Sequence, residues 1–161
     1  MLKVPSGEAK RLAKIIYQNA KLINARIGDI MFHQSSRDGQ QDSLPNLTVC
    51  SLVEVVQDTI SLLQNESLAQ QLNLIYSGPI IKKAIMIKTD PQKVQQILIN
   101  LLTNAFKFSS PGGKITVKLK YTAGLALDNF IEVADEGLGI RQGEMKDLFT
   151  PYFQSHDQRS L

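Results

Sequence analysis

Apolar residues recur along the first part of the chain at alternating intervals of four and three positions. That spacing is typical of a coiled-coil seam, in which the apolar stripe of one helix packs against another helix. It predicts one long helix over residues 8–34, with further apolar residues that widen the stripe as in a four-helix bundle. Because such a stripe buries little alone, we expect a homodimer through this helix. The seam consists of Ala9, Ala13, Ile16, Ala20, Ile23, Ile27 and Ile30.

A polar, turn-rich stretch follows this helix and separates it from the rest of the chain. We therefore expect three parts: a helix within residues 1–37, a linker over 38–46, and a globular unit over 47–161. The globular unit is expected to begin with a short extended segment. Ser51 and Glu54 then form the Ser-x-x-Glu pattern of a capping box, which predicts a helix that fades near residue 70.

A second helix of the globular unit is marked by Asp90 and Pro91, because aspartate is a good N-cap and proline is tolerated at the first helical position. It should end at the Ser-Ser-Pro-Gly-Gly run that follows Phe108. Its predicted core stripe is Val94, Ile97, Leu98, Leu101, Leu102, Ala105 and Phe108. Strands are expected at 73–76, 84–88, 115–119 and 130–134, the last two as an antiparallel hairpin.

The composition fits one compact domain with a short appended element, since the chain has 161 residues and 43% of them are hydrophobic. The net charge of +3 comes from basic and acidic residues spread along the chain, so no nucleic-acid partner is expected. A single cysteine, Cys50, fits a reducing, cytoplasmic compartment. No stretch approaches the roughly 20 apolar residues that span a bilayer. A membrane anchor of any parent protein would lie outside this chain.

Three polar residues of the helix after Asp90 share one face. Asn100, Asn104 and Lys107 follow one another at intervals of four and three, which places them within roughly 60° around the helix. The simpler interpretation is a solvated helix surface. Asparagine is a poor helix former, however, so two of them one turn apart favour a function. A carboxamide oxygen can bind Mg²⁺, and a nearby lysine can neutralise phosphate charge.

Asp135, Gly137 and Gly139 follow the last predicted strand. An aspartate at a strand end can accept a hydrogen bond from an exocyclic amine, and glycines let the backbone approach a ring or a phosphate closely. By itself this pattern is equally that of a glycine turn. Phe149 and Phe153 belong to an aromatic cluster farther along, which alone indicates core packing.

Taken in order, three segments resemble the N, G1 and F boxes of sensor histidine kinases: NLLTNAFKFS at 100–109, VADEGLGI at 133–140, and the aromatic stretch at 149–153. These kinases belong to a wider ATPase group that includes gyrase, mismatch-repair and heat-shock chaperone proteins. Residues 8–34 are similar to the second helix of the dimerisation hairpin that precedes the kinase catalytic domain. The resemblance implies an α+β fold, a two-layer α/β sandwich with a mixed, mainly antiparallel sheet and three helices on one face, preceded by the coiled-coil-like helix.

The resemblance also implies that the ligands are ATP and Mg²⁺. Asn104 would coordinate the magnesium with Asn100 beside it on the same helix face, while Lys107 and Phe108 would contact phosphate and nucleotide. Asp135 would hold the adenine amine from a buried position. The other implied nucleotide-binding residues are Gly137, Gly139 and Ile140 at the adenine pocket, with Phe149 and Phe153 at a mobile lid.

The sequence departs from this family in two places. No histidine followed by an acidic residue occupies the phosphoacceptor position, since His33 lies near the end of the first predicted helix and His156 lies in a polar tail. The chain also stops at Leu161, before a second glycine box. We therefore expect a hairpin that lacks its acceptor helix, a C-terminally truncated catalytic domain, and no kinase activity from the chain alone.

The leading prediction is the ATP-binding core of a two-component sensor histidine kinase. Such a kinase passes the γ-phosphoryl group of Mg-ATP to a histidine in a phosphorelay, and then to the receiver domain of a response regulator. One alternative is a nucleotide-driven ATPase of the gyrase or chaperone type, which typically has a water-activating glutamate on the helix of the N box. Residues 94–107 contain no carboxylate. The other alternative, from a different class, is a non-catalytic dimerisation or scaffold module.

Overall fold

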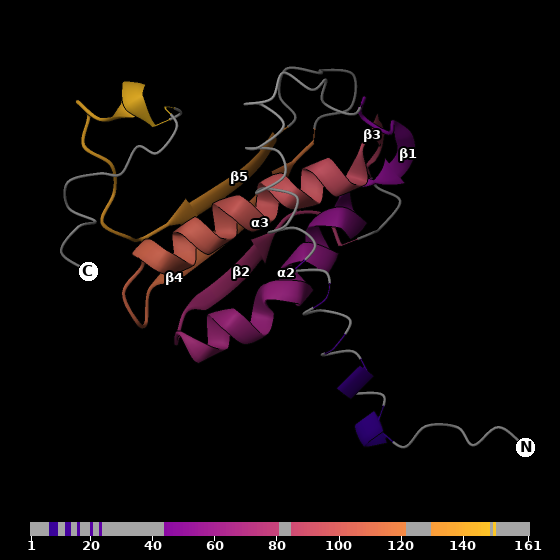
Figure 1. The fold of residues 1–161 in the computed structure, drawn as a ribbon, viewed down its shortest axis with the longest axis horizontal. Coiled ribbons are helices and arrows are strands. Elements are labelled where there is room, and N and C mark those ends of the chain that lie inside the picture. The colour runs from indigo at the N-terminus through magenta and orange to yellow at the C-terminus, as the bar shows by residue number, and fades with distance from the viewer. Residues whose placement is uncertain are drawn as a thin grey trace, which may run out of the picture.

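A computed structural model describes residues 7–9, 12, 13, 16, 20, 23, 44–80, 85–121, 130–148 and 150 (Figure 1). It contains both strands and helices, and not in strict alternation, so the chain is α+β as predicted. In chain order they are β1 (Thr48–Ser51), α2 (Leu52–Ala69), β2 (Asn73–Ser77), β3 (Met86–Thr89), α3 (Pro91–Phe108), β4 (Lys114–Lys120), β5 (Phe130–Asp135) and the short 3-10 helix η3 (Met145–Asp147).

The strands form two sheets. β1 and β3 pair antiparallel as a two-stranded sheet, with Thr48 opposite Thr89. The larger sheet has the order β2-β4-β5, in which β2 and β4 are parallel whereas β4 and β5 are antiparallel. The predicted hairpin of β4 and β5 is thus confirmed, and the larger sheet is mixed. The parallel pairing of β2 with β4 requires a crossover, which β3 and α3 supply along the chain.

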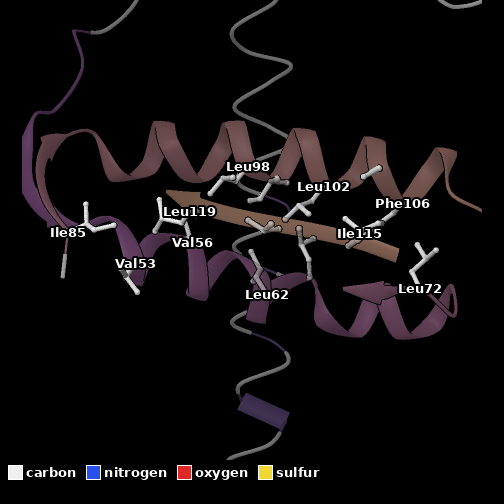
Figure 2. Close-up of a cluster of buried hydrophobic side chains, with 14 residues drawn as sticks. Val53, Val56, Leu62, Leu72, Ile85, Leu98, Leu102, Phe106, Ile115 and Leu119 are labelled. Atoms are coloured by element: carbon white, nitrogen blue, oxygen red, sulfur yellow. The ribbon is translucent and has the colours of Figure 1, made fainter. Parts of the chain in front are cut away.

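Helices α2 and α3 lie side by side on one face of the larger sheet (Figure 1). The burial of β4 alternates, with Ile115, Val117 and Leu119 buried, Thr116 half-buried and Lys118 exposed. Side chains from α2, α3 and β4 fill the space between the layers (Figure 2). The structure therefore describes a two-layer arrangement with two helices on the sheet. The buried apolar core is Val53, Val56, Leu62, Leu63, Leu72, Ile85, Leu98, Ile99, Leu102, Ala105, Phe106, Ile115, Val117 and Leu119.

Both helix starts have the caps that the sequence predicts. Ser51 is the N-cap of α2, and its side-chain oxygen accepts a hydrogen bond from the backbone N–H of Glu54 at 3.2 Å. Asp90 is the N-cap of α3, followed by Pro91 at the first helical position. Each cap satisfies backbone donors that have no partner within the helix.

The buried face of α3 differs from the predicted stripe. Ile99 and Phe106 are buried, whereas Ile97 is 59% exposed and Leu101 is 45% exposed. Because α3 packs on the sheet and on α2 along one side only, residues at the far edge of its broad apolar surface are left outside. The prediction that Ile97 and Leu101 belong to the core is therefore wrong. Their exposed side chains lie on the same side of the helix as Asn104.

Only part of the predicted N-terminal helix lies within the described residues. Residues 7–9, 12, 13, 16, 20 and 23 are helical, and the rest of the stretch 8–34 lies outside them, as does the linker before residue 44. Ile16 and Ile23, two members of the predicted seam, are 68% and 57% exposed. The coiled-coil seam and the dimer thus stay predictions. Within the part of the chain that the structure describes, no helix is long and apolar enough to cross a membrane.

Candidate functional site

The polar ridge of α3 faces solvent. Asn100, Asn104 and Lys107 are all exposed, and they follow one another along the helix from its middle to its last turn. α3 contains no Asp or Glu over its whole length, so the amide groups and Lys107 set the electrostatic character of this ridge. The prediction that these three side chains share an accessible face is confirmed.

Lys107 and Phe108 form a pair at the end of α3. The Nζ atom of Lys107 lies 4.9 Å from the centroid of the Phe108 ring, within the range of a cation–π contact. Phe108 is half-buried. This contact holds the flexible lysine near the helix end, where its charge also complements the partial negative charge of the last helical carbonyls.

Asp135 is the last residue of β5 and lies opposite Ile115 of β4. Ile115 is buried beneath the helices, so the alternation along the strands puts Asp135 on the side of the sheet that α3 covers. Its carboxylate is exposed there, which corrects the expectation of a buried carboxylate. The strand ends at this residue, and its side chain stays outside the buried core. One oxygen, Oδ1, accepts a hydrogen bond from the backbone N–H of Gly137 at 2.9 Å.

The loop after β5 is joined to the end of α3 through the backbone carbonyl of Phe108. The N–H of Leu138 donates to this carbonyl oxygen at 3.3 Å. Gly137 comes so close that a Cβ atom built on it would lie 2.5 Å from the same oxygen and 2.7 Å from Oδ1 of Asp135. Only glycine allows this approach. The two sequence segments that resemble the N and G1 boxes therefore meet in space at Phe108, Gly137 and Leu138.

Residues 138–140 of this loop are exposed to solvent. Gly139 has a φ of +69°, a left-handed conformation that favours glycine. Leu138 is 64% exposed and Ile140 is 55% exposed, so two apolar side chains face solvent beside the carboxylate of Asp135. Exposed apolar side chains next to polar groups are typical of a site that receives a ligand with a flat, apolar surface.

The contact between Phe108 and the glycine loop was not predicted from the sequence. The sequence predicts that Gly137 lets the backbone approach a ring or a phosphate closely, and it gives no signal for the approach to the Phe108 carbonyl. Phe149 and Phe153 lie outside the described residues, as do His33 and His156. The predicted aromatic lid is therefore not placed. Leu148, just before it, is 37% exposed.

The donors on this site suit a magnesium ion that arrives with a nucleotide. In the described ranges no group of three or more His, Cys, Asp or Glu could hold a metal ion by itself. Mg²⁺ usually keeps several waters and takes one or two protein oxygens together with the phosphates of its substrate. The exposed carboxamide of Asn104, without a carboxylate cluster around it, fits that pattern of ligation.

Comparison with known proteins identifies the same family as the motifs. Residues 89–161 match the family described as "Histidine kinase-, DNA gyrase B-, and HSP90-like ATPase". The aerobic respiration control sensor protein ArcB of Escherichia coli (strain K12) is 31% identical over 154 residues, which are 94% of this chain and 19% of ArcB. The chain thus spans about a fifth of the length of this curated relative.

Solved structures share the fold. The catalytic domain of histidine kinase ThkA in a nucleotide-free form aligns with a TM-score of 0.59 at 19% identity, over 70% of this chain and 71% of that one. The complex of ThkA with the response regulator protein TrrA aligns with a TM-score of 0.62 at 17% identity, over 95% of this chain and 42% of that one. Residues 89–161 therefore match the histidine kinase-, gyrase B- and HSP90-like ATPase family, and the chain resembles the ATP-binding catalytic domain of sensor histidine kinases.

Proposed function

We propose that this chain binds Mg-ATP between the end of α3 and the loop after β5, as the nucleotide-binding core of a sensor histidine kinase. The observation that carries the proposal is the contact of Gly137 and Leu138 with the Phe108 carbonyl. This contact brings the carboxylate of Asp135 and the ridge of Asn104 to the same end of the domain. A base and a polyphosphate chain can then be bound by two neighbouring elements at once.

The proposed roles follow from the chemistry of each side chain. The free lone pairs of the exposed Asp135 carboxylate accept a hydrogen bond from the adenine amine, while Leu138 and Ile140 cover the ring. Lys107 neutralises phosphate charge, and Phe108 packs on the nucleotide. Asn104, with Asn100 beside it, would hold Mg²⁺ through its carboxamide oxygen, and the ion would supply charge neutralisation for phosphoryl transfer.

In the parent protein this site would supply the γ-phosphoryl group for a histidine, and a response regulator would be the next acceptor. Support comes from two similar proteins: ArcB is an aerobic respiration control sensor protein, and ThkA forms a complex with the response regulator protein TrrA. A homodimer through the N-terminal helix is proposed because Ile16 and Ile23 present exposed apolar side chains at seam spacing. Without a carboxylate on α3 to activate water, transfer to a side chain is favoured over ATP hydrolysis.

Calorimetric titration of the chain with ADP, with and without Mg²⁺, tests the two halves of the site. Asp135→Asn should weaken binding about tenfold whether or not metal is present, the lower end of the range for a charged hydrogen bond because the carboxylate is exposed. Asn104→Ala should weaken binding only with Mg²⁺, because its proposed partner is the metal.

Matched controls come from α2, where Asp58 and Asn65 are exposed on a helix that contributes no residue to the proposed site. Asp58→Asn and Asn65→Ala should leave both affinities unchanged. If Asp135→Asn binds ADP as tightly as wild type does, the adenine base does not bind at this loop. Equal losses in both site variants regardless of metal, with intact circular dichroism spectra, would contradict the division of roles.

A further inference from the structure

The carboxylate of Asp90 is buried where β3 ends and α3 begins, with 8% of the residue exposed. Its Oδ1 atom accepts hydrogen bonds from the backbone N–H groups of Gln92 at 3.0 Å and Lys93 at 3.2 Å, as an N-cap does. Its Oδ2 atom accepts a hydrogen bond from the backbone N–H of Asn46 at 2.9 Å. One side chain therefore serves two segments that lie 44 residues apart in the sequence.

Asn46 lies where the chain from the N-terminal part reaches the domain, two residues before β1. β1 pairs with β3, and the last backbone pair of this ladder is Thr48 with Thr89. Beyond Thr89 the backbone turns into α3 and can no longer pair with an extended strand. The side chain of Asp90 takes over as acceptor and extends the pairing to Asn46.

We propose that Asp90 is a positioning residue that fixes the incoming chain before β1 to the start of α3, the helix that carries Asn100 and Asn104. A movement of the segment before β1 would then also move the start of α3, because the Asp90 carboxylate is bonded to both. The hydrogen bond between Asn46 and Asp90 can have this role whether or not the site binds a nucleotide. Its test therefore needs no ligand, and its failure is independent of the proposed function.

The surroundings of Asp90 support a charged carboxylate in this position. Hydrogen bonds from the backbone of Lys93 and of Asn46 hold the pKa of Asp90 below its ordinary value, against the opposing effect of burial. The ammonium group of Lys93 acts in the same direction. On the other side the thiol of Cys50 in β1 has a raised pKa, through burial and through the negative charge of Asp90.

Asp90→Asn is the decisive variant, because it keeps the shape of the side chain but leaves a single oxygen. Asparagine caps helices as well as aspartate does, so that oxygen can continue to accept from Gln92 and Lys93. The NH₂ group would then face the N–H of Asn46, a donor against a donor. Amide hydrogen exchange of the full ¹⁵N-labelled chain should show Asn46 exchanging about tenfold faster than in wild type, by analogy with the loss of one charged hydrogen bond.

Three further results complete the test. The Gln92 and Lys93 amides should keep their protection in Asp90→Asn and lose it in Asp90→Ala. Ser51→Ala, which removes the cap of α2, should release the Glu54 amide and leave Asn46 protected. In wild type the Asn46 amide shift should follow the titration of Asp90 at acid pH. An Asn46 amide that stays protected in Asp90→Asn, or that does not titrate, overturns the proposal.

Asn46→Pro tests whether the loss of this hydrogen bond affects α3. The variant removes the backbone N–H of residue 46 and keeps Asp90 as the N-cap of α3. The amide resonances of Gln92, Lys93 and Asn100 should shift in this variant. Adding Asp90→Asn to it should shift Asn100 no further, because both changes remove the same bond. If the α3 resonances are unchanged in Asn46→Pro, the bond has no effect on the conformation of α3, and that part of the proposal is refuted.

Discussion

Replacement of Gly137 by alanine should separate the loop after β5 from α3. The new Cβ atom would lie 2.5 Å from the carbonyl oxygen of Phe108, where ordinary contact begins at 3.4 Å. The loop must therefore move by about 0.9 Å, because the obstacle is backbone at the end of a helix rather than a flexible side chain. The hydrogen bond from Leu138 to the same oxygen is already 3.3 Å long and would not survive such a shift.

The magnitude follows from these two effects. Overpacking in a fitted site costs about 1–3 kcal/mol, which includes the lost hydrogen bond of roughly 1 kcal/mol. For a domain of this size each kcal/mol lowers the melting temperature by about 4 °C, so Gly137→Ala should melt roughly 4–12 °C below wild type. Nucleotide affinity should fall as well, since Asp135 loses the N–H of Gly137 that orients its carboxylate.

Gly143→Ala is the matched control, because a Cβ atom at Gly143 meets nothing within 4 Å and its φ is not in the left-handed region. It should leave stability unchanged or raise it by about 0.4–1 kcal/mol through the unfolded chain. Thermal unfolding by circular dichroism and an ADP titration of both variants compare the two positions. If Gly137→Ala behaves like Gly143→Ala in both assays, the loop is not held against α3 in the way described.

Three other outcomes test the core, the cap and the N-terminal helix. Phe106→Ala should cost about 3–5 kcal/mol in urea unfolding because the side chain is buried. Phe130 is 38% exposed, with the ammonium groups of Lys118 and Lys120 over its ring, so Phe130→Ala should cost about 1 kcal/mol or less. The urea midpoint of wild type should exceed that of Asp90→Asn at neutral pH. That difference should vanish as the pH falls through the lowered folded-state pKa of Asp90, since the stabilisation from a depressed carboxyl pKa is complete above the ordinary value of 3.8 and is lost below it. Ile23→Asp should abolish a concentration-dependent dimer in sedimentation, and an unchanged mass distribution would contradict the seam.

Local signals in the sequence were sufficient to predict most elements. Asp90 and Pro91 mark the start of α3, and alternation marks β4, because N-caps, proline and strand pleats act within a few residues. The buried face of α3 was less predictable. Ile97 and Leu101 are as apolar as Leu98 and were expected in the core, yet which side of a helix is covered depends on its neighbours in the fold.

Contacts between distant segments could not be derived from the sequence. The parallel pairing of β2 with β4 joins stretches that share no local signal, and the bond from Asn46 to Asp90 spans two segments that were interpreted separately. The same holds for the site. Asn104 and Asp135 could be singled out by residue type and spacing, whereas their common location depends on the approach of Gly137 to Phe108, which only the fold determines.

Adenine nucleotide should bind between the end of α3 and the loop after β5. Intermolecular nuclear Overhauser effects between the chain and ADP with Mg²⁺ can locate the base. We expect contacts from the adenine protons to Leu138 and Ile140, and a shift of the Asn104 side-chain amide that appears only when Mg²⁺ is present. Contacts confined to the outer face of the sheet, around Lys118 and Phe130, or no contacts at nucleotide concentrations that saturate kinase catalytic domains, would contradict it.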